Sequence, residues 1–230
     1  MALKYESVVP WGRSFEEYVD MFNLTQSDLD KSILGCGDGP AGFNSSMKQK
    51  GKKVISVDPV YQFSGEDIAR RIEETYHNVI NQTRQNRDKF IWSKIKTVED
   101  LGEVRMAAMK EFLSDYEEGR KEGRYVFAGL PVLPFQDNQF ELSLASHFLF
   151  LYTDNLSLDF HLQSISEMLR VSKEIRIFPL VDVNAVRSPY VNEIIFKYKN
   201  YGYDVEEEKV GYEFQKGGNT MLRISGGEKK

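Results

Sequence analysis

The chain has 230 residues, of which 41% are hydrophobic and 13% aromatic, a composition typical of one folded globular domain with a full core. The formal net charge of −5 argues against nucleic acid as the main partner, because a phosphate backbone requires a basic surface. The single cysteine, Cys36, excludes an intramolecular disulfide. We find no signal-peptide core and no apolar run long enough to span a bilayer, so we expect a cytoplasmic protein with no membrane contact.

In chain order, the first predicted element is an amphipathic helix at residues 14–22, which opens with a capping box. A polar turn at 25–31 follows and leads to a strand at 32–34. After a glycine-rich loop, a helix is predicted at 40–51, with a proline at its first position, where a missing N–H costs nothing. A second strand is predicted at 54–58.

The region 60–124 is much longer than an ordinary crossover between strands. It contains two amphipathic patterns, one after Ser64 and one after Thr97, each with an acidic residue three positions on. A connection of this length that carries its own helices usually has a function. We therefore predict one domain over residues 1–230, with 60–124 as a helical cap inserted over the ligand edge of its sheet.

Regular alternation of strands and helices resumes after the insertion. The predicted elements are strands at 125–130 and 140–145, a helix at 158–171, a strand at 174–180, a helix at 191–202, and β-like runs at 203–214 and 219–224. Strands that alternate with helices predict a mostly parallel α/β sheet, and the closing pair supplies an antiparallel strand. The predicted fold is a Rossmann-like, doubly wound, seven-stranded sheet.

The first predicted strand runs into a loop with glycines at Gly35, Gly37 and Gly39. Glycine is required where a backbone adopts positive φ or where a ligand approaches the main chain closely. Asp58, about twenty residues on at the end of the second strand, is placed to accept hydrogen bonds from ribose hydroxyls. Because Gly37, Gly39 and Gly42 also spell GxGxxG, the loop by itself leaves open a dinucleotide and an adenosyl ligand.

The segment LPVLPFQDNQFELSLASH, residues 130–147, is more specific. It resembles the class I S-adenosylmethionine-dependent methyltransferases, in particular the small-molecule branch that includes quinone-biosynthesis enzymes. The matching residues are Leu133, Pro134, Phe135, Asp137, Asn138, Phe140, Ser146 and His147. The sequence departs from that family at Ile33, where an acid is usual; Asp38 stands inside the loop instead.

The resemblance implies S-adenosylmethionine as cofactor and a small molecule as methyl acceptor, with nucleic acid unlikely and no metal ion. Carried over by position, the cofactor contacts are Gly35, Cys36, Gly37, Asp58, Pro59, Gly129, Leu130 and Ser146. Two other functions stay open, namely a nicotinamide-dependent oxidoreductase and a protein that binds S-adenosylmethionine without turnover. The sequence does not indicate the acceptor or the oligomeric state.

His147 is the predicted catalytic residue. It follows the fourth strand, where a histidine faces the substrate crevice and can act as general base. The alternative is that its side chain caps the following turn. Trp11, Arg13 and Tyr18 belong to the N-terminal segment, which is either a lid over the cofactor, with Arg13 meeting a carboxylate, or a plain helix packed on the sheet.

Overall fold

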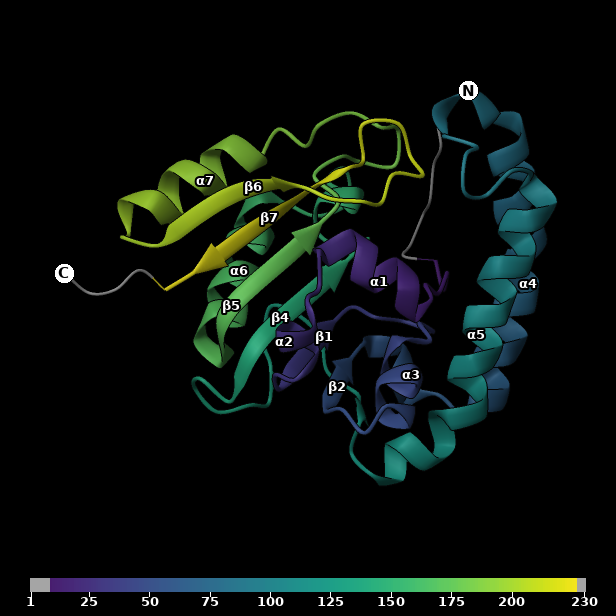
Figure 1. Ribbon diagram of the computed structural model, residues 1–230, viewed down its shortest axis with the longest axis horizontal. Helices are drawn as coiled ribbons and strands as arrows, with labels where there is room; N and C mark the ends of the chain where they lie inside the picture. Colours follow the sequence, from purple (N-terminus) through teal and green to yellow (C-terminus); the bar gives the residue numbers. More distant parts are fainter. Residues whose placement is uncertain (1–8, 227–230) are drawn as a thin grey trace.

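The computed structural model describes residues 9–226, which form a seven-stranded sheet flanked by helices (Figure 1). The strands are β1 (Ile33–Cys36), β2 (Val54–Val57), β3 (Tyr125–Val126), β4 (Phe140–Ser146), β5 (Ser172–Phe178), β6 (Asp204–Lys209) and β7 (Thr220–Ser225). Their order is β3-β2-β1-β4-β5-β7-β6, and β7 runs antiparallel to both of its neighbours while the other pairs are parallel. This confirms the doubly wound, mostly parallel sheet that the alternation of strands and helices predicted.

Helices cover both faces of the sheet. They are α1 (Phe15–Phe22), α2 (Gln26–Leu29), α3 (Phe43–Gln49), α4 (Gly65–Gln85), α5 (Val98–Lys121), α6 (Leu158–Val171) and α7 (Val191–Asn200). On one face, residues of α6 and α7 such as Ile165 and Ile194 share an apolar cluster with Ile175 of β5. On the other face, α1 and α3 pack Tyr18 and Phe43 onto the sheet. In the described part of the chain, no helix is long and apolar enough to cross a membrane.

The two helices predicted in the insertion are confirmed. Ser64 caps α4, and Thr97 and Asp100 form a capping box at the start of α5, as the sequence indicated. The helices lie side by side as a long pair next to α3 and β3 (Figure 1). Tyr116 of α5 is fully buried in an aromatic cluster with Tyr61 and Tyr125, which fixes the pair to the edge of the sheet.

The predicted turn at 25–31 is wrong, because it contains the short helix α2. Thr25 and Asp28 cap each other's backbone N–H groups, and the Asp28 carboxylate also accepts a hydrogen bond of 3.1 Å from Arg176 of β5. The local sequence around Asp28 does not predict this long-range contact. The third strand is shorter than predicted, since the chain leaves the sheet after Val126 and turns back through an isolated bridge between Gly129 and Val132.

The helix predicted from Pro40 begins three residues later, at Phe43. In the loop before it, backbone N–H groups form hydrogen bonds with other segments of the chain. The backbone N–H of Gly39 donates to Asp58 Oδ2 at 2.9 Å, and that of Gly42 donates to the carbonyl oxygen of Arg13 at 3.0 Å. These N–H groups are satisfied without helical turns, so the glycine loop is longer than the sequence indicated.

Candidate functional site

A cavity of about 440 Å³, here called the strand-end cavity, lies at the carboxyl ends of β1, β2 and β4. In doubly wound sheets this is the crevice where the strand order reverses, and ligands bind there. All but two of the predicted site residues line it, namely Gly37, Asp58, Pro59, Gly129, Leu130, Ser146 and His147. The exceptions are Gly35 and Cys36, which are buried within β1 and do not line the cavity.

The glycines of the loop have different roles. Gly37 and Gly39 adopt φ values of +71° and +52°, a conformation that other residues rarely adopt. Gly35 is ordinary in this respect, but a Cβ atom there would overlap the carboxylate of Asp38. Gly35 therefore makes room for a buried acidic side chain rather than for a ligand at the strand itself.

Two carboxyl groups stand at the floor of the strand-end cavity. Asp38 is buried and accepts hydrogen bonds from Tyr18 Oη at 2.8 Å and from Ser56 Oγ at 2.6 Å. Asp58 is half-buried and accepts from the backbone N–H groups of Gly39 and Val60 at 2.9 and 2.8 Å. Burial raises the pKa of each to about 6. The sequence had not assigned Asp38 to the site, since an acid inside a loop is ordinarily solvated.

His147 adopts φ +51°, in the left-handed region that is uncommon for residues other than glycine. Its backbone N–H donates to the carbonyl oxygen of Phe178 at 2.7 Å, which holds it there. Its Nδ1 lies 3.0 Å from Ser146 Oγ, and within residues 9–226 no hydrogen bond joins the ring to the following turn. Burial, followed by Arg13 and Arg105, holds its pKa well below the ordinary value, so the imidazole is neutral at pH 7.

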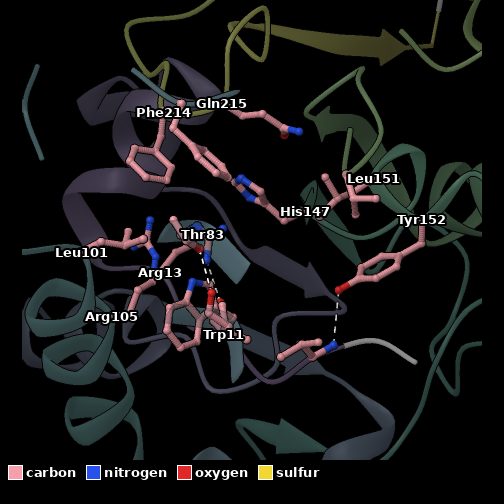
Figure 2. Close-up of a pocket in the computed structure, with 14 residues that line it drawn as sticks. Trp11, Arg13, Thr83, Leu101, Arg105, His147, Leu151, Tyr152, Phe214 and Gln215 are labelled. Carbon is pink, nitrogen blue, oxygen red and sulfur yellow. Dashed lines mark hydrogen bonds between the residues drawn. The ribbon is translucent and has the colours of Figure 1, made fainter. Parts of the chain in front are cut away.

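A second cavity of about 120 Å³, here called the arginine cavity, adjoins the first and shares Val9, Trp11, Arg13 and His147 with it. In Figure 2, His147 lies in the middle, with Arg13 and Arg105 on one side and Leu151 and Tyr152 on the other. Besides these, its lining consists of Val79, Thr83, Phe90, Leu101, Val183, Phe214 and Gln215. The insertion therefore contributes directly to this cavity, through α4, the connection after it and α5.

The N-terminal segment forms a wall of both cavities. The backbone N–H of Val9 donates to Tyr152 Oη at 3.2 Å, and a Cβ at Gly12 would overlap the carbonyl oxygen of Pro40. Arg13 accepts the N–H of Gly42 through its own carbonyl oxygen. The segment thus crosses the glycine loop closely and places the Arg13 side chain between the two cavities.

Arg105 and its partners were not found from the sequence. Arg105 is fully buried, and its Nη1 donates to Glu17 Oε2 at 2.5 Å while its Nη2 donates to Tyr212 Oη at 3.2 Å. Although burial by itself would raise the pKa of Glu17, Arg105 outweighs it and lowers that pKa to about 2. An arginine amid the charged residues of a long helix looks like any solvated position, so no local signal distinguishes it.

No family model matches the chain. Similar solved structures include magnesium protoporphyrin IX methyltransferase from Synechocystis PCC 6803 with bound SAH, at 9% identity and a TM-score of 0.48, covering 87% of this chain and 76% of that one. A SAM-dependent methyltransferase from Methanosarcina mazei has 11% identity and a TM-score of 0.45, with 89% and 95% covered.

One relative is similar over nearly its whole length. The uncharacterized protein MJ0045 of Methanocaldococcus jannaschii is 35% identical over 223 residues, which are 96% of this chain and 98% of that protein. The chain therefore belongs to the same family as MJ0045.

Proposed function

We propose that the protein is an S-adenosylmethionine-dependent methyltransferase with a small-molecule acceptor. The observation that carries the proposal is the strand-end cavity at the reversal of strand order, with a positive-φ glycine loop on one side and Asp58 on the other. Its 440 Å³ lie within the range of about 300–1,000 Å³ that is typical of small-molecule sites, which suits a nucleoside joined to an amino acid. A second cavity opens beside it for an acceptor.

The lining fits such a ligand. The two oxygens of Asp58 are already oriented by backbone N–H groups and retain lone pairs for ribose hydroxyls. Pro59, Gly129 and Leu130 offer an apolar surface for a flat base next to that carboxylate. Gly37 brings its backbone to the cavity without a side chain in the way. The cofactor contacts at these positions and at Ser146 are part of the proposal; Gly35 and Cys36 support the loop from behind.

When bound, S-adenosylmethionine supplies a methyl group on a sulfonium, whose carbon bonds to an acceptor lone pair as the C–S electron pair returns to sulfur. Such a displacement requires mainly alignment and exclusion of water. His147 stands where the two cavities join, and its neutral imidazole has Nδ1 engaged with Ser146. Because Ser146 Oγ donates to Met21 Sδ, it accepts from Nδ1–H, and the other ring nitrogen carries the lone pair that takes a proton from the acceptor.

The nicotinamide alternative has less support. A dinucleotide places its pyrophosphate on the helix that follows the glycine motif. Here that helix, α3, begins only at Phe43, beyond the glycine loop that lines the cavity. Gly42, the third glycine of GxGxxG, packs against Ala108 and Glu111 of α5, as a third glycine also does in dinucleotide-binding domains, so the late start of α3 carries the argument.

Calorimetry on the full chain tests the cofactor proposal. S-adenosylhomocysteine should bind, whereas NADH should give neither heat nor enhanced fluorescence. No heat with millimolar S-adenosylhomocysteine would overturn the proposal, and NADH binding would favour the oxidoreductase. Transfer of labelled methyl from S-adenosylmethionine into the small-molecule fraction of a cell extract then tests turnover. Label that appears only in nucleic acid, or nowhere, would contradict a small-molecule acceptor.

His147→Asn tests the base. Asparagine tolerates the left-handed conformation but lacks the imidazole, so the fold should persist. We expect kcat for the methylated acceptor to fall about 100-fold, the low end for loss of a general base. S-adenosylhomocysteine affinity should remain within about threefold, by our estimate for a residue that acts on the acceptor. An unchanged kcat would show that His147 only shapes the cavity wall.

We also propose that residues 60–124 act as a cap within the single domain 1–230. Val79 and Thr83 of α4 and Leu101 and Arg105 of α5 line the arginine cavity, although the helices are anchored far away on β3. Residues of the same insertion, among them Phe63 and Arg71, also line the strand-end cavity, so the cap borders both ligand sites. The cytoplasmic location stays a prediction.

A further inference from the structure

The arginine cavity contains more positive than negative charge. Its lining includes the guanidinium groups of Arg13 and Arg105, and among residues 9–226 no carboxylate lines it. His147, the other basic group of the lining, is neutral because burial and the two arginines depress its pKa. The nearest carboxylate behind the lining is Glu17, which carries one negative charge. Two positive charges therefore share one counter-charge.

Glu17 is already fully engaged with Arg105. Its Oε2 accepts from Arg105 Nη1 at 2.5 Å and from the backbone N–H of Ser14 at 2.9 Å. Its Oε1 accepts from Tyr212 Oη at 3.0 Å. No hydrogen bond joins Glu17 to Arg13 in the described part of the chain. Among residues 9–226, Arg13 therefore has no ion-pair partner of its own, although Glu17 acts on it from a distance.

Arg13 has donors to spare. Its Nη1 donates to the carbonyl oxygen of Trp11 at 2.7 Å, whereas its Nε is buried and has no acceptor among the described residues. Burial, and after it the charge of Arg105, lowers its pKa from the ordinary value, although a guanidinium stays protonated. An arginine whose Nε is buried without an acceptor is stabilised best by a carboxylate or phosphate, which accepts two parallel hydrogen bonds.

The rest of the cavity is mostly apolar. Leu101, Phe90, Phe214 and Leu151 surround it, and Figure 2 shows the last of these facing Arg13 and Arg105 across His147. Its volume of about 120 Å³ is close to the roughly 150 Å³ of a cavity that holds one benzene ring. The lining therefore suits a compact molecule with one anionic group and an apolar body.

We propose that the arginine cavity binds a small organic acid, with its carboxylate on Arg13 and its apolar body between Leu101, Leu151 and Phe214. The identification of this acid as the methyl acceptor rests on the proposed function. The binding of an anion in the cavity is independent of it. Because Arg13 also lines the strand-end cavity, the amino-acid carboxylate of the cofactor is a second source of the same chemistry. The experiment has to separate the two.

A matched pair of probes tests the charge. The full chain, saturated with S-adenosylhomocysteine, is titrated with 4-fluorobenzoate and with the neutral 4-fluorobenzamide, and binding is followed by fluorine NMR. The two probes have nearly the same shape and differ in one charge. A charge-assisted hydrogen bond should make the benzoate bind at least about tenfold more tightly. Equal affinities, or tighter binding of the benzamide, would overturn the proposal.

Variants locate the anion. Arg13→Gln should weaken benzoate binding at least about tenfold and leave benzamide unchanged, since only a charged contact is lost. Arg84→Gln, an exposed arginine on the same insertion that pairs with Glu99, is the control and should change neither affinity. If Arg13→Gln fails to fold, Leu151→Phe fills the cavity without removing a charge and should abolish benzoate binding while S-adenosylhomocysteine still binds. Benzoate binding that is unaffected in a folded Arg13→Gln, or in Leu151→Phe, overturns the proposal.

Two further outcomes distinguish the sources of the carboxylate. In the first outcome, benzoate competes with S-adenosylhomocysteine, and Arg13→Gln lowers the affinity for S-adenosylhomocysteine. The same variant leaves the affinity for methylthioadenosine, which lacks the amino-acid part, unchanged. Arg13 then binds the cofactor, and the proposal is wrong. If S-adenosylhomocysteine does not bind at all while benzoate still binds through Arg13, the proposed function fails and the organic-acid site stands.

Discussion

The two adjoining cavities share Arg13 and His147 but differ in charge and in origin. The strand-end cavity contains Asp38 and Asp58, which come from the loops after β1 and β2. In the arginine cavity, Arg105 and most of the apolar side chains come from the insertion and from later loops. No carboxylate among residues 9–226 lines this cavity. The loops after the strands thus supply acceptors for hydroxyl groups. Donors for an anion come from the N-terminal segment and from the insertion, which also places Arg71 at the strand-end cavity. One domain thus combines the crevice typical of doubly wound sheets with a second cavity built by other segments.

The sharpest way to break this comparison is Glu17→Gln, which removes the counter-charge behind the arginine cavity. Arg105 would be left fully buried without a carboxylate, so we expect the free energy of unfolding to fall by about 3–5 kcal/mol. Chemical denaturation measures it. Glu16→Gln, the exposed neighbour on α1, should change it by no more than about 0.5 kcal/mol. Similar values for both variants would mean that the arginine pair is not electrostatically coupled to Glu17.

On the opposite side, Asp58→Asn tests the carboxylate of the strand-end cavity. The amide retains the shape but loses the charge and one acceptor, so the Kd for S-adenosylhomocysteine should rise about 100-fold. Fluorobenzoate affinity should be unaffected, because Asp58 does not line the arginine cavity. Asp159→Asn on the exposed side of α6 serves as control in the same calorimetric assay. A loss at both cavities would show that they are not independent sites.

The pH dependence of cofactor affinity is a smaller effect that tests whether Asp58 binds the cofactor as an ionised carboxylate. Burial raises the pKa of Asp58, and that of Asp38, to about 6. If the ligand binds the ionised carboxylates, protonation below pH 6 opposes binding, and Kd should rise about tenfold per pH unit as the pH falls. Calorimetry between pH 5 and 7.5 measures this, and Asp58→Asn should flatten the profile. A Kd that is constant over this range would exclude an ionised Asp58 as ligand group.

The weakest expected effect concerns the insertion. If the cap closes on an acceptor, amide exchange around Val79, Thr83 and Leu101 should slow several-fold when fluorobenzoate joins S-adenosylhomocysteine, because local opening is then linked to ligand release. The strands β6 and β7 line neither cavity and are the internal control, whereas the loop between them carries Phe214 and Gln215 and is left out of it. Unchanged exchange in the insertion would assign it to stability instead of acceptor binding.

Local patterns determined most of the secondary structure. Capping residues at Ser14, Ser64 and Thr97 predicted the starts of three helices, because a helix start is fixed by its own first turn. The spacing of Gly37 and Asp58 behind consecutive strands also predicted the strand-end crevice, since parallel strands present their carboxyl ends at one edge. The prediction failed at α2, where a capping box of Thr25 and Asp28 opens a helix within a polar stretch, and before α3, where Gly39 and Gly42 bond to other segments instead of starting a helix.

The sequence by itself therefore determined the sheet, the glycine loop and the placement of Asp58 and His147, all of which follow from short-range rules. Only the tertiary structure decided that Asp38 is buried, that Gly35 serves Asp38, and that Arg13 and Arg105 meet in one cavity. The physical reason is that the groups around a charged side chain decide whether its burial destabilises the fold or makes it a binding group. Those surroundings come from α1, α5 and the C-terminal loops, which are brought together only by packing.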